Sequence, residues 1–295
     1  MTVLITGAHG QDGHYLSRLC SEVGATVIAT GRNMLNANLN VADSEAVEAM
    51  IRETTPDYIF HFAAISSISH DTLFGNHEAI STGSVNILES CWRHCRQARI
   101  FLPGSALQFD NHGLPIDEET AFLATSPYSA ARIYMTYLAR YFRSKGLRCY
   151  VGYLFHHDSP LRTSHHLSQK IAQAAVRIAH GSKEKLEVGR LSVQKEWNFA
   201  GDIVRAMWTL VNQDKIWEAV IGSGRAFPVQ TWVEACFEPL GLKWKKHVIE
   251  MPNYRPDFER LVSNPSRITS LGWNPTVSMK ALATMMVGVS NAESL

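Results

Sequence analysis

A glycine-rich turn between an apolar strand and an amphipathic helix most constrains what this chain can fold into. Residues 3–5 are an apolar run that leads directly into Gly7-Ala8-His9-Gly10-Gln11-Asp12-Gly13. Apolar residues then recur at helical spacing as far as Val23, and residues 25–29 read as a second strand. The pattern predicts strand, turn, helix and strand within the first 32 residues of a chain of 295.

Each glycine of the turn has a distinct expected use. Gly7 permits a tight turn, Gly10 lets backbone N–H groups approach a pyrophosphate, and Gly13 lets the helix pack against the strand. We therefore expect a dinucleotide site here, and the alternative is an ordinary tight turn between a strand and a helix.

The end of the second strand bears on which dinucleotide is bound. An acidic residue at this point binds a ribose 2′-hydroxyl and favours NAD, but this chain has Gly31-Arg32-Asn33. The guanidinium of Arg32 suits a 2′-phosphate, which favours NADP over NAD. The alternative is that Arg32 is a solvated surface residue.

Composition excludes several other classes of protein. The chain is 45% apolar and 19% charged with a formal net charge of +1, and it has no basic run. We expect neither nucleic acid nor a membrane as a partner, and a start without a signal peptide leads us to expect a cytoplasmic protein. The five cysteines are expected to be reduced thiols, and no cluster predicts a metal site.

Strands alternate with helices along the first half of the chain. We expect a short strand and turn at 38–43, further strands at 58–64, 99–103 and 148–154, and helices at 44–53 (capped by Ser44), 78–96 and 126–144. Alternation of this kind predicts a Rossmann-like, doubly wound parallel sheet, with ligands at the carboxyl ends of the strands.

The regular alternation of strands and helices ends after residue 155. We expect residues 1–155 to form the dinucleotide-binding domain and 156–295 to form mainly a smaller C-terminal α/β substrate lobe, with a helix within 198–213 packing back on the first domain. Within the second half, strands are expected at 183–189 and 216–222, and helices at 165–180, 201–211 and 229–240.

Three residues of the first domain form a candidate catalytic set. Ser105 follows a predicted strand, and Tyr128 and Arg132 lie four apart, on one face of a predicted helix. A tyrosine beside a fixed cation can give or take a proton at a sugar hydroxyl or ketone, and Ser105 would bind the same oxygen. Ala63 and Ala64 would leave room for a cofactor. The alternative is a surface Tyr/Arg pair.

The chain resembles extended short-chain dehydrogenases/reductases of the NAD-dependent epimerase/dehydratase family. More narrowly, it is similar to GDP-mannose 4,6-dehydratases and GDP-4-keto-6-deoxymannose reductases over nearly its whole length. The matching segments are the glycine turn with Gln11-Asp12-Gly13, Phe60-His61-Phe62-Ala63-Ala64, Ser105, Ser126-Pro127-Tyr128, 153–162, 189–191, 195–208, Arg255-Pro256, 264–267 and 271–275.

The resemblance implies an enzyme that uses NADP to modify a nucleotide sugar, with GDP as the expected nucleotide, and that assembles as a homodimer or homotetramer. It adds Gln11, Asp12, Tyr128 and Arg132 to the expected cofactor-binding residues. It places His156, His157, Arg162, Lys195 and Arg255 at the substrate, with His157 either facing the sugar or holding its loop.

The departures from the family pattern are informative about the reaction. Leu107 stands where the dehydratases carry the glutamate that removes the sugar C5 proton, and Arg132 stands where they carry lysine. A leucine cannot act as a base, so elimination would need another carboxylate such as Asp110. Arginine keeps the charge of lysine but presents a larger, planar group.

These features favour reduction of the 4-keto group of a GDP-linked deoxyhexose over dehydration. One alternative is a GDP-mannose 4,6-dehydratase with a relocated base. The other is a non-catalytic protein that binds NADP or a nucleotide sugar.

Overall fold

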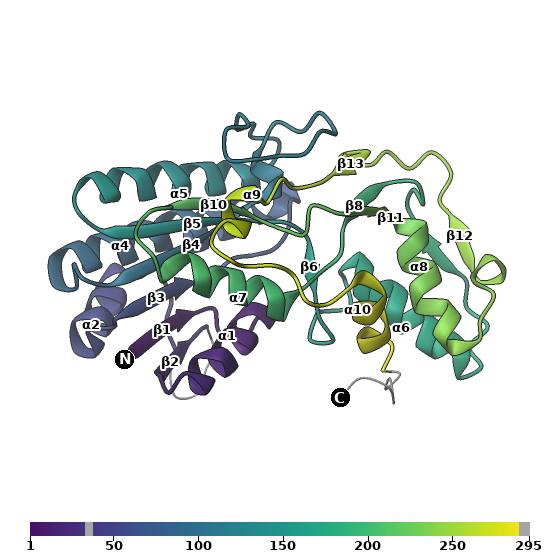
Figure 1. The fold of residues 1–295 in the computed structure, drawn as a ribbon, viewed down its shortest axis with the longest axis horizontal. Helices are drawn as coiled ribbons and strands as arrows, with labels where there is room; N and C mark the ends of the chain where they lie inside the picture. Colours follow the sequence, from purple (N-terminus) through teal and green to yellow (C-terminus); the bar gives the residue numbers. More distant parts are fainter. Residues whose placement is uncertain (33–37, 289–295) are drawn as a thin grey trace.

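A parallel sheet of six strands forms the centre of the larger part of the molecule. The structure, a computed structural model, describes residues 1–32 and 38–288. The strand order is β10-β5-β4-β3-β1-β2, and every neighbouring pair is parallel (Figure 1). The strands are β1 (Thr2–Thr6), β2 (Thr26–Thr30), β3 (Tyr58–His61), β4 (Arg99–Ser105), β5 (Arg148–Leu154) and β10 (Glu218–Ile221). The order of connection reverses at β1, so the expected doubly wound sheet is confirmed.

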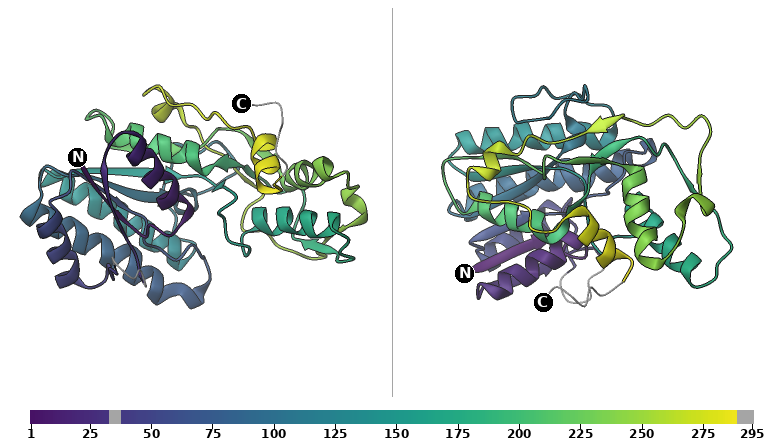
Figure 2. Two further views of the ribbon diagram at one scale, coloured as in Figure 1. Left: turned by 90° about the horizontal axis from the view of Figure 1, so that it is seen from below. Right: turned by 45° about the vertical axis from the view of Figure 1, so that its right-hand side comes forward.

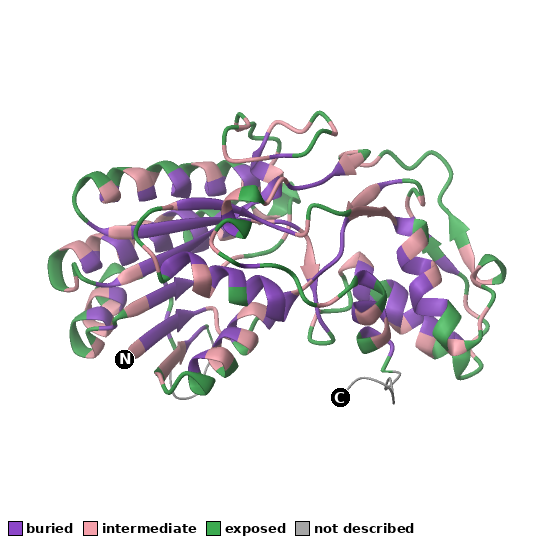
Figure 3. Ribbon diagram, in the orientation of Figure 1, coloured by how far each residue is buried: buried purple, intermediate pink, exposed green. Residues whose placement is uncertain are grey.

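Helices cover both faces of this sheet. α1 (Gln11–Glu22) and α7 (Ala200–Val211) pack together on one face, and α2 (Ser44–Thr54), α4 (Gly83–His94) and α5 (Pro127–Ser144) lie on the other. Successive strand residues enter opposite cores, with Leu4 and Ile59 on the α5 side and Ile5 and Phe60 on the α7 side. Because both faces are covered, the strands β1, β3, β4, β5 and β10 are largely buried in Figure 3, whereas the edge strand β2 is only partly buried.

The second half of the chain builds a smaller lobe beside the sheet (Figure 2). Trp232 and Phe237 are fully buried at its centre, among helices α6 (Leu167–Ala179), α8 (Val229–Phe237) and α10 (Met279–Met286). Its short strands form the sheet β11 (Ala226–Pro228)-β8 (Gln194–Glu196)-β13 (Arg260–Leu261) and the pair β7 (Leu186–Val188) and β12 (Val248–Glu250). The expected smaller α/β lobe is therefore present. The chain returns from it to the sheet twice, first through α7 and β10 and later through α9 (Ser266–Thr269), which contacts β10.

The strand expected at 38–43 is wrong. Only an isolated bridge joins Gly31 to Asn38, and the residues that follow form a turn in which Asn40 Oδ1 accepts the Ala42 N–H at 3.2 Å. The expected cap of α2 is also wrong, because Asp43, rather than Ser44, accepts the first free N–H groups of that helix.

Other elements differ in their limits. Helical structure expected at 78–96 begins earlier, with α3 (Leu73–Asn76) and a π-helical turn at His77–Thr82, and ends with α4 at His94. The strand expected at 183–189 is only β7, and Asn33 lies outside the described residues. Within 1–32 and 38–288, no helix combines the length and apolar character needed to cross a bilayer.

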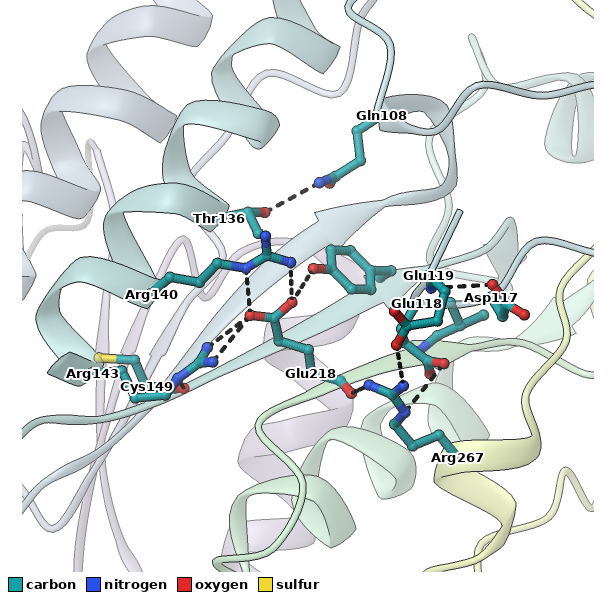
Figure 4. Close-up of polar contacts among 12 residues, drawn as sticks. Gln108, Asp117, Glu118, Glu119, Thr136, Arg140, Arg143, Cys149, Glu218 and Arg267 are labelled. Carbon is teal, nitrogen blue, oxygen red and sulfur yellow. Dashed lines mark hydrogen bonds and ion pairs between the residues drawn. The ribbon is translucent and has the colours of Figure 1, made fainter. Parts of the chain in front are cut away.

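Charged side chains close the free edge of the sheet at β10. The Glu218 carboxylate accepts hydrogen bonds from Arg140 and Arg143 of α5, as Figure 4 shows. Glu118 accepts the outward N–H of Val220 at 2.7 Å and pairs with Arg267. A hollow of about 420 Å³ lies beside this cluster. It is at the end of the sheet where β10 begins, which is opposite to the carboxyl ends of the strands. The cluster blocks pairing of the edge strand with another chain.

Candidate active site

The glycine turn lies at the carboxyl ends of β1 and β3, where the strand order reverses. Gly7 has a φ of +73°, and a Cβ placed on it would lie 2.5 Å from the Ala63 nitrogen. A Cβ on Gly13 would lie 2.5 Å from the Ala8 oxygen, so both positions require glycine. Gly10 differs, because the nearest atom to its Cβ would be 3.6 Å away. That atom is the Gly7 oxygen, at an ordinary van der Waals distance, so the contacts within the chain do not by themselves require glycine at position 10.

The side chain of Gln11 is bound by the loop that follows β5. Its Nε2 donates to the carbonyl of His157 and its Oε1 accepts the hydroxyl of Ser159, both at 3.0 Å. Gln11 is only 7% exposed. The residue at the start of α1 that the sequence assigned to the cofactor therefore joins the turn to a segment far along the chain.

Asp12 is bound by the same loop. The Nε2 of His157 lies 3.1 Å from each Asp12 carboxylate oxygen, and its Nδ1 lies 2.8 Å from the carbonyl oxygen of Phe155. Burial opposes ionisation of both groups, but the attraction between the two opposite charges outweighs this effect. The carboxylate therefore raises the pKa of His157, and the imidazole lowers the pKa of Asp12. The imidazole of His157 therefore contacts α1 through Asp12 and its own loop through Phe155.

Ser105 is the last residue of β4 and caps the short 3₁₀ turn at Ala106–Gln108. Its Oγ accepts the N–H of Leu107 at 3.2 Å, which leaves the hydroxyl hydrogen available to another acceptor. Its backbone N–H donates to Oε1 of Gln108 at 2.8 Å. The serine is thereby held at the carboxyl edge of the sheet.

Tyr128 and Arg132 share one face of α5, as their spacing predicted. The guanidinium carbon of Arg132 lies 5.1 Å from the centre of the Tyr128 ring, and its Nη1 donates to the carbonyl of Pro103 at 2.6 Å. Arg132 is buried and its Nε has no partner among the described residues, so it is not a solvated surface arginine. The arrangement fixes a cation beside the phenol ring.

Arg132 also affects His61, the last residue of β3. Burial, reinforced by the nearby charge of Arg132, lowers the pKa of His61 to about 3. His61 lies between the hydroxyl of Thr6, 2.7 Å from its Nδ1, and the carbonyl of Ala79, 3.1 Å from its Nε2. The imidazole is therefore neutral, with Nε2 as the donor and Nδ1 as the acceptor.

Leu107, at the position where the resemblance implies a base, has apolar surroundings. Leu107 is partly buried and packs against the same hydrophobic core as Tyr128, Ala63 and Ala64. Asp110, the carboxylate that could replace a glutamate, lies 3.1 Å from Nε2 of His112, and its side chain is 37% exposed.

Three expected substrate residues gather around a buried carboxylate that the sequence did not single out. Asp158 contacts His156 at 2.6 Å and Arg162 at 3.4 Å, and it accepts the hydroxyl of Ser168 at 2.6 Å. Burial disfavours the charged carboxylate of Asp158, but its cationic neighbours outweigh burial and lower the pKa of Asp158. Burial lowers the pKa of His156 to about 4. The four-residue spacing between Asp158 and Arg162 was the sequence signal that could have revealed this cluster.

Lys195 approaches this carboxylate from β8. Its Nζ lies 4.6 Å from the ring centre of Trp197, and no hydrogen bond joins it to the described part of the chain. Burial lowers the pKa of Lys195 to about 8. An ammonium without an acceptor beside an arginine is a feature of anion sites.

The other two expected cations lie at the surface. Among the described residues, Arg32 makes long contacts of 3.4 Å to Asn40 and Glu78, and about half of its side chain is exposed. Arg255 is exposed and forms no ion pair with any residue in 1–32 or 38–288. The structure does not bring either of them into the Asp158 cluster.

Sequence reasoning also missed Glu196, a buried residue of β8. Its carboxylate accepts backbone N–H groups from Ser263 and Ser223, each at 2.6 Å, and the amide of Asn198 at 3.0 Å. It thus ties three segments of the lobe together. The adjacent Trp197 was a sequence signal that Glu196 is buried, and a buried charge must be paired.

Comparisons with solved structures bear on the fold. The UDP-glucose 4-epimerase of Thermus thermophilus, solved in complex with NAD, superposes with a TM-score of 0.84 at 21% identity, covering 98% of this chain and 100% of that one. RMD from Pseudomonas aeruginosa, solved with NADPH, gives a TM-score of 0.86 at 17% identity over 97% of this chain and 96% of that one. The fold is that of an extended short-chain dehydrogenase/reductase of the epimerase/dehydratase type.

Sequence comparison is more specific. The profile of the family described as GDP-mannose 4,6 dehydratase matches residues 4–286. GDP-mannose 4,6 dehydratase 2 of Arabidopsis thaliana is 30% identical over 96% of this chain and 85% of its own length. The human GDP-mannose 4,6 dehydratase is 28% identical over 96% and 90%. This chain belongs to the GDP-mannose 4,6-dehydratase family, whose members modify nucleotide sugars.

Proposed function

We propose that this protein uses NADP(H) to reduce the 4-keto group of a GDP-linked deoxyhexose. The observation that carries the proposal is the apolar Leu107, at the position where the resemblance implies a base, in a site that has Ser105, Tyr128 and a fixed cation. Reduction needs a proton donor and a polarised carbonyl, and elimination needs a base as well. The residues present supply the first set of groups.

The residues at the glycine turn fit a dinucleotide. The contact between Gly7 and Ala63 is too close for any Cβ, whereas a Cβ on Gly10 would make only an ordinary contact with the Gly7 oxygen at 3.6 Å. The N–H groups at the start of α1 face this turn and favour a pyrophosphate. Arg32, exposed at the end of β2, would pair with a 2′-phosphate, which supports NADP over NAD.

The chemistry follows from the positions of the side chains. The bound cofactor supplies the hydride. Tyr128 would give its phenolic proton to the carbonyl oxygen of the sugar, and Ser105 would donate its free hydroxyl hydrogen to the same oxygen. Arg132 keeps positive charge beside the ring and so stabilises the phenolate left behind.

The lobe would hold the nucleotide. Lys195 and Arg162 supply two cations near Asp158, and Arg255 would join them from the surface of the lobe, where it has no competing ion pair in the described chain. Two phosphates match this set of charges. The Nε2 of His156 is occupied by Asp158, so the opposite edge of the ring would make the expected contact with the sugar.

A second candidate is a 4,6-dehydratase, which the names of the matched relatives favour. That reaction would require Asp110 to leave His112 and reach the sugar C5 proton. The third candidate, a binder without turnover, predicts cofactor binding alone.

We also propose a homodimer or homotetramer. Tyr134, Tyr137 and Tyr141 are each about half exposed along α5, a sheet-covering helix, and form an aromatic stripe that a second copy would bury. Sedimentation velocity of the wild type and of a triple Tyr→Lys variant at these positions tests this.

The functional test uses two incubations followed by mass spectrometry. One contains GDP-4-keto-6-deoxymannose and NADPH, and the other contains GDP-mannose and NADP⁺. Gain of two hydrogens in the first supports reduction, and loss of water in the second supports dehydration. Silence in both, with cofactor binding shown by thermal shift, supports the binder.

A further inference from the structure

The start of α1 carries an acidic residue where a dinucleotide pyrophosphate would bind. Asp12 is the second residue of this helix, and a carboxylate in the first turn is stabilised by the helix dipole. The same carboxylate repels a pyrophosphate that approaches the same N–H groups. Some group must offset this charge if the cofactor is to bind.

The cation in direct contact with Asp12 among the described residues is the imidazole of His157. Both of its nitrogens face acceptors, because Nδ1 meets the carbonyl of Phe155 at 2.8 Å and Nε2 meets the Asp12 carboxylate at 3.1 Å. A carbonyl and a carboxylate cannot donate, so each ring nitrogen carries hydrogen and the ring is an imidazolium. The side chains are only 11% and 20% exposed, which limits screening by solvent.

The loop around His157 is held against α1 independently of this pair. Gln11 binds the carbonyl of His157 and the hydroxyl of Ser159, and Tyr15 of α1 meets Phe199 edge to face at 5.1 Å. Phe199 belongs to β9 (Asn198–Phe199), which pairs with the short strand that contains His157. Loss of the imidazolium would therefore leave the loop in place and change mainly the local charge.

We infer that His157 is a positioning residue for the cofactor: it neutralises Asp12 and so keeps the N-terminus of α1 able to bind a pyrophosphate. The inference rests on the proposed dinucleotide site. The other charges that face the pair are Arg162 and Asp158, both on the same loop as His157. They oppose one another, so the charge balance at Asp12 depends on His157.

The test measures the Kd of NADP⁺ by calorimetry for the full chain and its variants at pH 7. His157→Gln keeps a hydrogen-bonding side chain without charge, and we expect it to weaken binding about tenfold, as for loss of one partly buried charge pair. Asp12→Asn removes the repulsive group, so it should bind NADP⁺ at least as tightly as the wild type. The double variant should return to within about threefold of the wild type.

The opposite signs separate this role from a structural one. If the contact only holds the loop, Asp12→Asn will weaken binding as much as His157→Gln, and the inference is wrong. It is also wrong if His157→Gln binds like the wild type. His165→Gln, at an exposed histidine nearby, is the matched control. A wild type that binds no dinucleotide would instead overturn the proposed function.

Discussion

The guanidinium of Arg132 lies over the ring of Tyr128, with its carbon atom 5.1 Å from the ring centre. The contact is fixed from the other side by the carbonyl of Pro103 in β4. Because the family carries lysine at this position, the geometry shows how an arginine can occupy it: the longer side chain reaches the strand and lies over the phenol ring. A charge is therefore kept beside the candidate proton donor.

Removal of this charge should slow the reaction. We expect Arg132→Met to lower kcat by about 100-fold, the usual cost of losing support for a general acid, while Arg132→Lys retains more of the activity than Arg132→Met. Steady-state kinetics with NADPH and the keto sugar measure both. Unchanged kcat in Arg132→Met would show that the cation has no part in the reaction.

Leu107→Glu places a carboxylate where the dehydratases have their base. We expect the folded state to lose about 1 to 3 kcal/mol, because the residue is partly buried against the core, and the sugar to exchange hydrogen at C5. Incubation of the 4-keto sugar in deuterated water, followed by mass spectrometry, measures the exchange. Leu107→Gln is the matched control, since it has nearly the same shape as the glutamate without a base. Equal exchange in both variants would contradict the assignment.

Arg32→Ala should distinguish the two dinucleotides. If the guanidinium binds the 2′-phosphate, its loss weakens NADP⁺ about tenfold or more and leaves NAD⁺ unchanged. Titration of both cofactors gives the ratio of the two Kd values. Arg18→Ala, at an exposed arginine paired with Glu22 on α1, is the control. An equal loss for both cofactors would remove the argument for NADP.

Stability should fall as the pH falls from 6.5 towards 4. His61 and His156 have pKa values lowered to about 3 and about 4, chiefly by burial, so the unfolded chain binds their protons first. Each contributes a slope of about 1.4 kcal/mol per pH unit in this window. His157 has a raised pKa, so its contribution is present below pH 6.5 and is lost as the pH rises through its folded value.

Urea unfolding at several pH values measures this slope for the wild type and for His61→Gln, which can still bind Thr6 and Ala79. The variant should show a slope shallower by about one proton. If its slope equals that of the wild type, His61 is not held neutral in the fold.

The sequence predicted the parts of the site that depend on local pattern. The glycine turn, the end of β4 at Ser105, and the pairing of Tyr128 with Arg132 each follow from a few neighbouring residues, whereas the strand expected at 58–64 ends already at His61. The partners of Gln11 and Asp12 could not be predicted in this way, because the loop that binds them lies about 145 positions further along the chain. The strand expected within 38–43 is absent for another reason: the side chains of this segment bind their own backbone, and this competes with strand pairing.

The most direct measurement of the central claim follows deuterium from NADPH labelled at the transferable position. We expect one deuterium at C4 of the sugar product made from GDP-4-keto-6-deoxymannose, abolished in Tyr128→Phe and unchanged in Tyr134→Phe, an exposed tyrosine of the same helix. Absence of the label at C4, together with loss of water from GDP-mannose by the wild type, would contradict the account and identify a dehydratase that works without a base at position 107.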